Sequence, residues 1–227
     1  MNDFCATLLA IPQGYDLSST RLVRTLATGR APHKLIARLA ARTVFDADLA
    51  NRYLARLLVI AEDEALSWHL CRQLVEENGG VVQRDGLAFS TEARHLTWAK
   101  QFASSVGVSK GDLDAMLATF SPFPEMEEAL GNRDWLGASA LYFCGIEAMT
   151  PAVGRAIIDA LKPNCLPEGS MLFYENHIIA DEVHGREAVE LMAALCDTDD
   201  KRTRAIEAAR YGAATHFARF NASTSRA

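Results

Sequence analysis

The chain has 227 residues, 49% of them hydrophobic, and its formal net charge is −6 at pH 7. This is enough apolar material for a large core, while the acidic balance and the lack of a Lys/Arg cluster argue against nucleic-acid binding. No uninterrupted apolar run approaches the roughly 18–20 residues of a membrane span, and residues 1–15 lack the basic start of a secretory signal. We therefore expect a cytoplasmic protein with neither a membrane nor a nucleic acid as partner.

The N-terminal part of the chain shows mainly helical periodicity. Helices are expected over residues 18–29, 33–44 and 46–77. Ser18 or Ser19 could cap the first helix and Asp46 the third, which stops at Asn78-Gly79-Gly80. Residues 79–86 are expected to form a loop with at most a short extended piece.

Helical patterns also dominate the C-terminal part. Helices are expected over residues 90–106, from Ser109 onward with an interruption at 121–124, from Asn132 or Asp134 to Leu161 with a break at Thr150-Pro151, over 171–195 and over 199–220. Residues 163–169 are expected to form a loop, and 221–227 a frayed polar tail. The prediction is a single all-α domain over residues 1–227, a bundle of about eight to ten helices.

The clearest functional motif is His177-x3-Asp181-x2-His184. On a helix, residues three, four and seven apart share one face, so two imidazoles and a carboxylate would point into a single spot. The competing interpretation is a solvated polar stripe, because Glu175 and Glu187 indicate an exposed side of the same helix. Taken alone, the motif does not distinguish a ligand cluster from a solvated polar stripe.

Glu147 is the only charged side chain between residues 135 and 154. A carboxylate with such apolar neighbours is expected to point inward, where it needs a cation or a proton. That cation could be a metal ion or an arginine from another helix.

Glu92-x2-His95 is another carboxylate and imidazole pair at helical spacing. The pair is a weak signal alone, because Glu and His three residues apart are common on exposed surfaces. Together with Glu147 and the motif at residues 177–184, it matches the way helical bundles hold two irons. Carboxylates neutralise the two cations, and imidazoles supply neutral nitrogen ligands. Glu62 and Glu64 are candidates for an extra carboxylate ligand, although exposed positions on a helix are the favoured interpretation for both.

From about Leu57 to Leu195 the chain resembles the heme-oxygenase-like di-iron oxidases and oxygenases. Their superfamily also holds thiaminase II and PQQ-synthesis protein C. The resemblance consists of matches of His177, Asp181 and His184 with the family's last-helix motif, of Glu147 with its central carboxylate, and of Glu92 and His95 with its Glu…His helix.

This resemblance implies a heme-oxygenase-like bundle without heme, whose metal ligands are the six residues just named. It also implies two Fe(II) ions, with manganese acceptable at one site, and O2 as co-substrate. The implied substrate is a small amino acid, amine or fatty acid that undergoes C–C cleavage, desaturation or N-oxygenation. Glu147, Tyr142 and Tyr174 are the expected catalytic residues, and a homodimer is compatible with the family.

Three other functions stay open from the sequence. A metal-free enzyme like thiaminase II or PQQ-synthesis protein C would bind an aromatic heterocycle through the same histidines. A ferritin-like di-iron protein would use Glu62 or Glu64 as a fourth carboxylate, but His177 adds a third histidine that ferritin-like sites lack. A non-catalytic helical binding protein would hold the motif residues in ion pairs.

Overall fold

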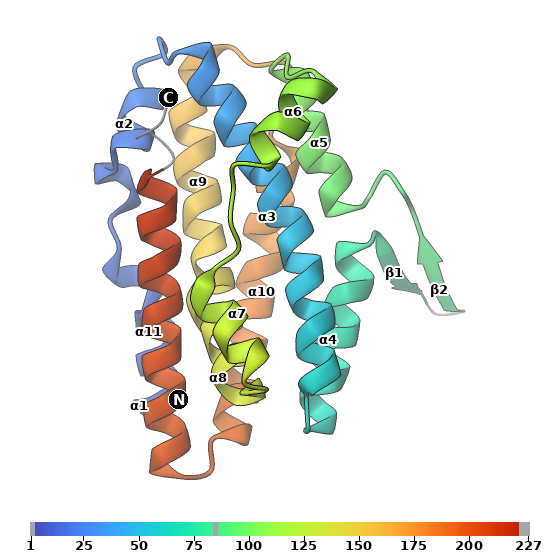
Figure 1. The fold of residues 1–227 in the computed structure, drawn as a ribbon, viewed down its shortest axis with the longest axis vertical. Helices are drawn as coiled ribbons and strands as arrows, with labels where there is room; N and C mark the ends of the chain where they lie inside the picture. The colour runs from blue at the N-terminus through green and yellow to red at the C-terminus, as the bar shows by residue number, and fades with distance from the viewer. Residues whose placement is uncertain (1–2, 84–85, 223–227) are drawn as a thin grey trace.

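Long helices that run side by side dominate the computed structural model, which describes residues 3–83 and 86–222 (Figure 1). The α-helices are α1 (Asp3–Ala10), α2 (Arg21–Leu26), α3 (His33–Ile60), α4 (Glu64–Glu77), α5 (His95–Ser105), α6 (Lys110–Leu117), α7 (Pro124–Gly131), α8 (Trp135–Ser139), α9 (Thr150–Leu161), α10 (Leu172–Leu195) and α11 (Asp199–Ala222). Shorter turns of helix are η1 (Pro12–Gly14), η2 (Leu17–Ser19), the π-helix η3 (Ala140–Ile146), η4 (Glu147–Met149) and η5 (Lys162–Asn164). The all-α prediction is confirmed.

Helix α3 is longer than expected: it continues past Val44 and ends at Ile60. Asp46 pairs with Arg42 one turn earlier, at 2.7 Å, and so stabilises the helix interior instead of capping a new helix. The break comes at residues 61–63, where the Asp63 side chain accepts a hydrogen bond from Leu66 N at 2.9 Å and starts α4. The expected single helix over residues 46–77 is therefore wrong.

A β-hairpin replaces most of the loop expected at residues 79–86. Strand β1 (Gly80–Gln83) pairs antiparallel with β2 (Gly86–Phe89), and Figure 1 shows the hairpin projecting from the bundle. Residues 90–94 then form a turn, and α5 begins only at His95. The expected helix start near residue 90 is wrong, which changes the position of Glu92. Residues 84–85, and 223–227 of the expected tail, lie outside the described part of the chain.

The apolar stretch after Asp134 forms a core helix. Asp134 caps it by accepting from Gly137 N at 2.9 Å, and Pro151 restarts α-helical geometry in α9, both as expected. The helical stretch Trp135–Asn164 is long enough to cross a membrane and contains an 18-residue window with a mean hydropathy of 1.2, but 78% of that window is buried inside the protein. Packing in the core accounts for this apolar character.

Helix α11 lies unusually close to η3. A Cβ added at Gly145 would come within 2.6 Å of Ala209 O, and one added at Gly212 within 2.4 Å of Leu141 O. Two glycines thus permit a backbone contact that no larger residue allows, next to the segment that carries Glu147.

Replacing Gly145 by alanine is expected to lower the free energy of unfolding by about 1–3 kcal/mol, because backbone atoms must move apart. Gly111→Ala is the matched control, since a Cβ at this α6 position meets nothing within 4 Å. The control should be neutral or stabilising by up to about 1 kcal/mol. Urea unfolding measures both, and equal effects would contradict the close contact.

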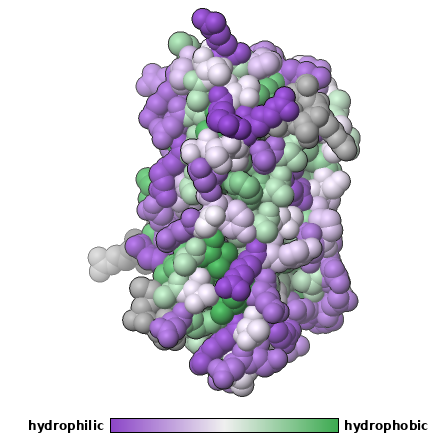
Figure 2. Space-filling model, turned by 90° about the vertical axis from the view of Figure 1, so that its left-hand side faces the viewer, coloured by the Kyte–Doolittle hydropathy of each residue, from purple (hydrophilic) through white to green (hydrophobic). Residues whose placement is uncertain are grey.

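The buried apolar residues form two clusters, one around Tyr53, Leu57 and Phe143 and the other around Leu26 and Phe102. Polar residues cover much of the outside. On the face shown in Figure 2, smaller apolar areas lie between hydrophilic ones.

Candidate metal centre

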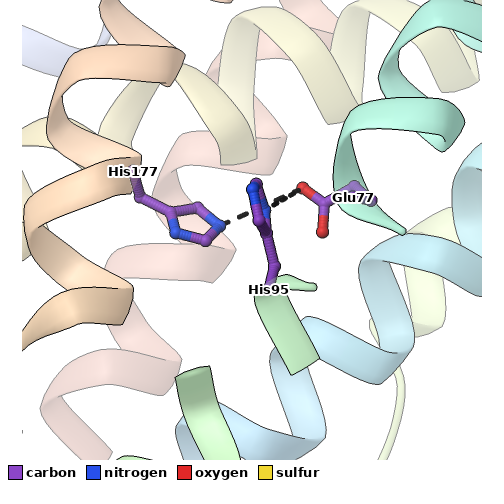
Figure 3. Close-up of side chains that lie close together, drawn as sticks. All are labelled: Glu77, His95 and His177. Carbon is purple, nitrogen blue, oxygen red and sulfur yellow. Dashed lines mark ion pairs between the residues drawn. The ribbon is translucent and has the colours of Figure 1, made fainter. Parts of the chain in front are cut away.

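Three metal-ligating side chains from three helices meet in the interior. Glu77 is the last residue of α4, His95 the first of α5, and His177 lies in the second turn of α10 (Figure 3). His95 Nδ1 is 2.8 Å from Glu77 Oε1, and His177 Nε2 is 4.0 Å from the same oxygen. Glu77 Oε1 thus lies near a ring nitrogen of each histidine.

The orientation of His177 leaves one nitrogen available to a metal. Its Nδ1 donates to Phe173 O at 2.7 Å, so the lone pair of Nε2 faces Glu77 and His95. A backbone carbonyl that holds the second ring nitrogen is typical of metal-ligating histidines. Burial lowers the pKa of His177 to about 4, and repulsion from His95 adds to this, so the ring is neutral as a ligand must be.

The position of Glu77 combines two features that disfavour a charged carboxylate, a helix C-terminus and burial. The C-terminal end of a helix carries partial negative charge, which disfavours a carboxylate, and Glu77 Oε2 is buried with no hydrogen-bond partner among the described residues. Burial raises the pKa of Glu77, but His95 and His177 outweigh this and lower it overall. The carboxylate is thus charged and desolvated, and the neighbouring histidines favour its charged form.

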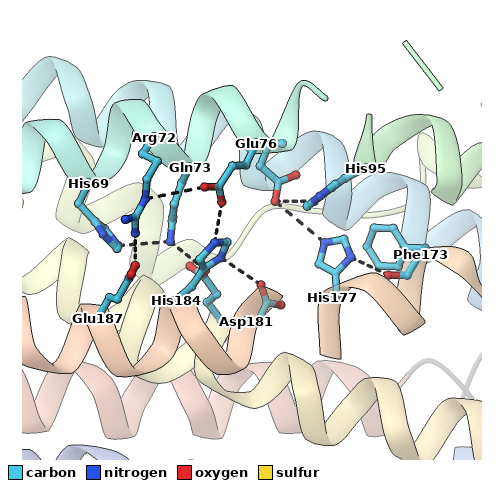
Figure 4. Close-up of polar contacts among 12 residues, drawn as sticks. His69, Arg72, Gln73, Glu76, His95, Phe173, His177, Asp181, His184 and Glu187 are labelled. Atoms are coloured by element: carbon cyan, nitrogen blue, oxygen red, sulfur yellow. Dashed lines mark hydrogen bonds and ion pairs between the residues drawn. The ribbon is translucent and has the colours of Figure 1, made fainter. Parts of the chain in front are cut away.

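A second group lies beside the first along α10. Glu147 from η4 joins Asp181 and His184, and Figure 4 shows α10 with His177, Asp181 and His184 facing α4. His184 Nδ1 is 3.3 Å from Glu147 Oε1 and 3.5 Å from Asp181 Oδ1, while Nε2 donates to Glu76 Oε2 at 2.7 Å. Because Glu76 fixes Nε2, Nδ1 is the nitrogen that a metal would use.

His184 carries the compensating charge in the protein without metal. Burial lowers its pKa, but the hydrogen bonds with Asp181, Glu147 and Glu76 outweigh burial and raise it to about 12. Burial also raises the pKa of Asp181 to about 7 and raises that of Glu147. One imidazolium thus holds together carboxylates that repel each other, and a metal ion could take the place of its Nδ1 proton.

Glu147 is oriented by neighbours on α4. Gln73 Nε2 donates to Glu147 Oε1 at 3.1 Å and lies 3.2 Å from His69 Nε2. Burial lowers the pKa of His69 to about 4, so this ring is neutral and can accept from Gln73. The sequence analysis did not identify Gln73 as part of the site.

Replacing Gln73 by leucine is expected to weaken metal binding by about 10–100-fold, because Glu147 loses the donor that orients it. Gln101→Leu is the control, since Gln101 is exposed on α5. Competition with a metal-sensitive dye measures the affinity of both variants. A Gln73→Leu protein with unchanged affinity would show that this hydrogen bond does not position Glu147.

The donor sets of both groups suit iron. Within each group the ligand atoms lie within 4.8 Å of one another. Two histidines and one carboxylate, as in the first group, are typical of non-heme Fe(II) sites that activate O2. The second group has one histidine and two carboxylates, which suit Fe(II) and Mn(II) alike.

The structure brings together five of the six predicted ligands. These are His95, Glu147, His177, Asp181 and His184. They do not share a single spot as the spacing suggested, because His177 joins the first group and Asp181 and His184 join the second. Glu92 does not take part: it is exposed in the turn before α5, where it accepts from Ser90 Oγ at 2.8 Å.

Glu77 occupies the place expected for Glu92. Glu62 and Glu64 are also outside the site, as both are exposed, and Glu62 accepts from Trp135 Nε1 at 3.2 Å. One sequence signal for Glu77 existed: two acidic residues, Glu76 and Glu77, stand at a helix C-terminus, where the helix dipole disfavours them.

A cavity of about 130 Å³ opens onto the site. Its lining includes Glu77, Glu147, His177 and Asp181 together with apolar and aromatic residues of both core clusters. The lining also includes Tyr142 and Tyr174, and Tyr174 Oη lies 2.6 Å from Thr43 Oγ1. Burial raises the pKa of both phenols, so both are protonated.

Comparison with known protein families identifies the family of this chain. Residues 38–216 match the family described as iron-containing redox enzyme, and this range holds all six residues of the two groups. The chain belongs to this family. No curated protein matches the chain.

Two solved structures resemble this member of the iron-containing redox enzyme family, and they support a heme-oxygenase-like fold. One is a domain of unknown function with that fold from Shewanella denitrificans OS217, with 17% identity, a TM-score of 0.64, and coverage of 96% of this chain and 88% of that one. Another is a TenA homologue from Pseudomonas syringae pv. tomato str. DC3000, with 11% identity, a TM-score of 0.67, and coverage of 98% and 90%. The predicted heme-oxygenase-like bundle is thereby confirmed.

Proposed function

We propose that the protein is a cytoplasmic non-heme di-iron enzyme that uses O2 to oxidise or oxygenate a small metabolite. The observation that carries this proposal is the pair of buried ligand groups, Glu77/His95/His177 and Glu147/Asp181/His184, which meet along α10 in a member of an iron-containing redox family. Carboxylates buried without enough positive charge favour a site built for cations.

The ligand groups, the cavity lining and Tyr174 would have different roles. Each group would hold one ferrous ion, and the ions when bound supply electrons to O2 and stabilise developing negative charge. Ile146 and Phe173 line the cavity and keep water from the reacting atoms. Tyr174 keeps its proton because of burial and donates it to Thr43 Oγ1, whose own proton goes to Leu39 O, so Tyr174 Oη can accept a hydrogen bond from a substrate.

Anaerobic titration of metal-free protein with ferrous iron tests the proposal. We expect about two irons bound per chain after desalting, and O2 consumption that depends on the bound iron. His177→Ala should lose both the iron of its group and the O2 reaction. Wild-type protein that binds no iron, or binds it without consuming O2, would contradict the proposal.

The competing functions predict different results in the same assay. A metal-free enzyme of the TenA type would convert an aromatic heterocycle without iron, and the similarity to a TenA homologue at 11% identity supports only the shared fold. A non-catalytic binding protein would lose stability, but no activity, in the alanine variants. Iron content therefore separates both from the di-iron enzyme, and conversion of a heterocycle separates the two from each other.

A further inference from the structure

The hydroxyl of Tyr174 offers the cavity a hydrogen-bond acceptor. Tyr174 Oη lies 2.6 Å from Thr43 Oγ1, and Thr43 Oγ1 donates to Leu39 O at 3.0 Å. Because a threonine hydroxyl has one proton, the proton between the two hydroxyls belongs to Tyr174. Both residues are buried and line the cavity. The lone pairs of the Tyr174 oxygen are therefore left for a group that enters the cavity.

Asp46 supplies a second acceptor to the same cavity wall. It follows Thr43 by three residues on α3, so the two side chains share one face of that helix, and both line the cavity. Arg42 Nε pairs with Asp46 Oδ2 at 2.7 Å, whereas Asp46 Oδ1 is buried with no hydrogen bond among the described residues. A buried carboxylate oxygen without a partner needs an explanation, and a donor on a ligand would supply one.

These two acceptors lie close together. Tyr174 is hydrogen-bonded to Thr43, and Thr43 is one turn of α3 from Asp46. Burial raises the pKa of Tyr174, the bond to Thr43 lowers it, and the negative charge of Asp46 raises it again, so the carboxylate is near enough to act on the phenol. Arg42 already pairs with this carboxylate, so its free oxygen needs a hydrogen-bond donor rather than a further cation.

We propose that Tyr174, Asp46 and Arg42 form a subsite for a primary carboxamide, which donates one N–H to Tyr174 Oη and the other to Asp46 Oδ1. The carboxamide group is neutral and planar, and its two N–H bonds diverge, so they can reach separate acceptors. Its carbonyl oxygen can accept from Arg42, which lines the cavity and is 13% exposed. A carboxamide therefore satisfies both acceptors without adding a charge.

The cavity sets the size of the rest of the ligand. Its volume of about 130 Å³ is close to the roughly 150 Å³ that holds one benzene molecule. Apolar side chains such as Ile146, Val153 and Phe173 make up much of its lining. The carboxamide thus carries a short hydrocarbon body, with about six heavy atoms in the whole ligand.

The subsite belongs to the same cavity as the metal ligands. Tyr174 lies one turn before His177 on α10, and both line the cavity. The amide would be the substrate of the proposed metal centre, so the subsite deepens the proposed function and rests on it. Binding of the amide needs no metal, however, and can be tested on metal-free protein. Its failure is therefore distinguishable from failure of the di-iron proposal, which is read in iron content and O2 consumption.

The test is an NMR titration of the metal-free full chain with isobutyramide and with methyl isopropyl ketone. The ketone has the same shape, but a methyl group replaces the –NH2 group of the amide. We expect the amide to bind about tenfold more tightly than the ketone, because the ketone leaves both acceptors without a donor. A ketone that binds as tightly as the amide, or more tightly, would overturn the proposal.

Two substitutions remove the acceptors one at a time. Asp46→Asn should weaken binding of the amide by about tenfold to a hundredfold, because the asparagine turns its oxygen to Arg42 and presents an –NH2 group to the cavity. Tyr174→Phe should weaken it by about twofold to tenfold, because the lost acceptor is neutral. Neither substitution should change binding of the ketone, which reports whether the cavity is intact.

Asp48→Asn and Tyr211→Phe are the matched controls. Asp48 also pairs with an arginine one turn away, Arg52 at 2.9 Å, but it is 53% exposed and outside the cavity lining. Tyr211 is likewise 53% exposed and outside the lining. Both variants should bind the amide as the wild type does, and an equal loss in either would contradict the subsite. If Asp46→Asn or Tyr174→Phe fails to fold, the wild-type comparison of amide and ketone still decides.

Discussion

Replacing Glu77 by glutamine is expected to weaken iron binding at the first group by well over tenfold, while Glu92→Gln leaves it unchanged. Glutamine keeps the shape of the side chain but removes the negative charge that His95 and His177 face across 2.8 and 4.0 Å. Loss of an outer partner alone costs about 10–100-fold in metal affinity, so loss of a ligand should cost at least as much.

Glu92→Gln is a strict control for this result. Glu92 is exposed and bonded to Ser90, yet it has the favourable helical spacing to His95 in the sequence. Bound iron per chain, measured after anaerobic loading, compares the two variants directly. Iron lost from the Glu92 variant and kept by the Glu77 variant would reverse the assignment.

Metal binding is expected to raise the melting temperature by about 5–10 °C for each occupied site, because ferrous iron at about 100 times its Kd adds about 2.7 kcal/mol of stability per site, and each kcal/mol is worth about 2–4 °C for a chain of this size. Asp181→Asn should lose the gain from the second group, which then lacks a carboxylate ligand, and keep the gain from the first.

The same substitution should stabilise the metal-free protein. Burial raises the pKa of Asp181 from 3.8 to about 7, so between these pH values the folded state binds more protons than the unfolded state. Stability of the metal-free protein therefore falls as pH rises from about 4 to 7, and asparagine removes this loss. At pH 8 in EDTA we expect the free energy of unfolding of Asp181→Asn to exceed that of the wild type by about 1–3 kcal/mol. This difference should shrink toward pH 4.

Asp159→Asn serves as the charge-matched control, because Asp159 is exposed and pairs with Lys162 at 2.6 Å. It should shift neither the metal-dependent gain nor the metal-free stability by more than about 0.5 kcal/mol. Thermal melts with and without iron measure all three proteins. A metal-dependent gain as large in Asp181→Asn as in the wild type would show that this carboxylate is not a ligand.

Local patterns predicted the part of the site that lies on single helices. His177, Asp181 and His184 share a face of α10 because their spacing follows the helical repeat, and Glu147 points inward because its neighbours are apolar. The sequence could not show that His177 joins Glu77 and His95 while Asp181 and His184 join Glu147, because that depends on how α4, α5 and η4 pack against α10.

The error at Glu92 arose from a helix boundary. The spacing Glu92-x2-His95 has meaning only if both residues are helical, and the turn at 90–94 places the start of α5 at His95. The carboxylate that lies beside His95, Glu77, is separated from it in the sequence by the hairpin, and such a separation has no periodicity to detect. Long-range packing therefore decides which carboxylate meets His95.

The most direct test of the whole account is anomalous X-ray diffraction, at the iron absorption edge, from crystals loaded anaerobically with ferrous iron. We expect two neighbouring peaks, one among Glu77, His95 and His177 and the other among Glu147, Asp181 and His184. A single peak, no peak, or an iron bound at Glu92 would contradict it.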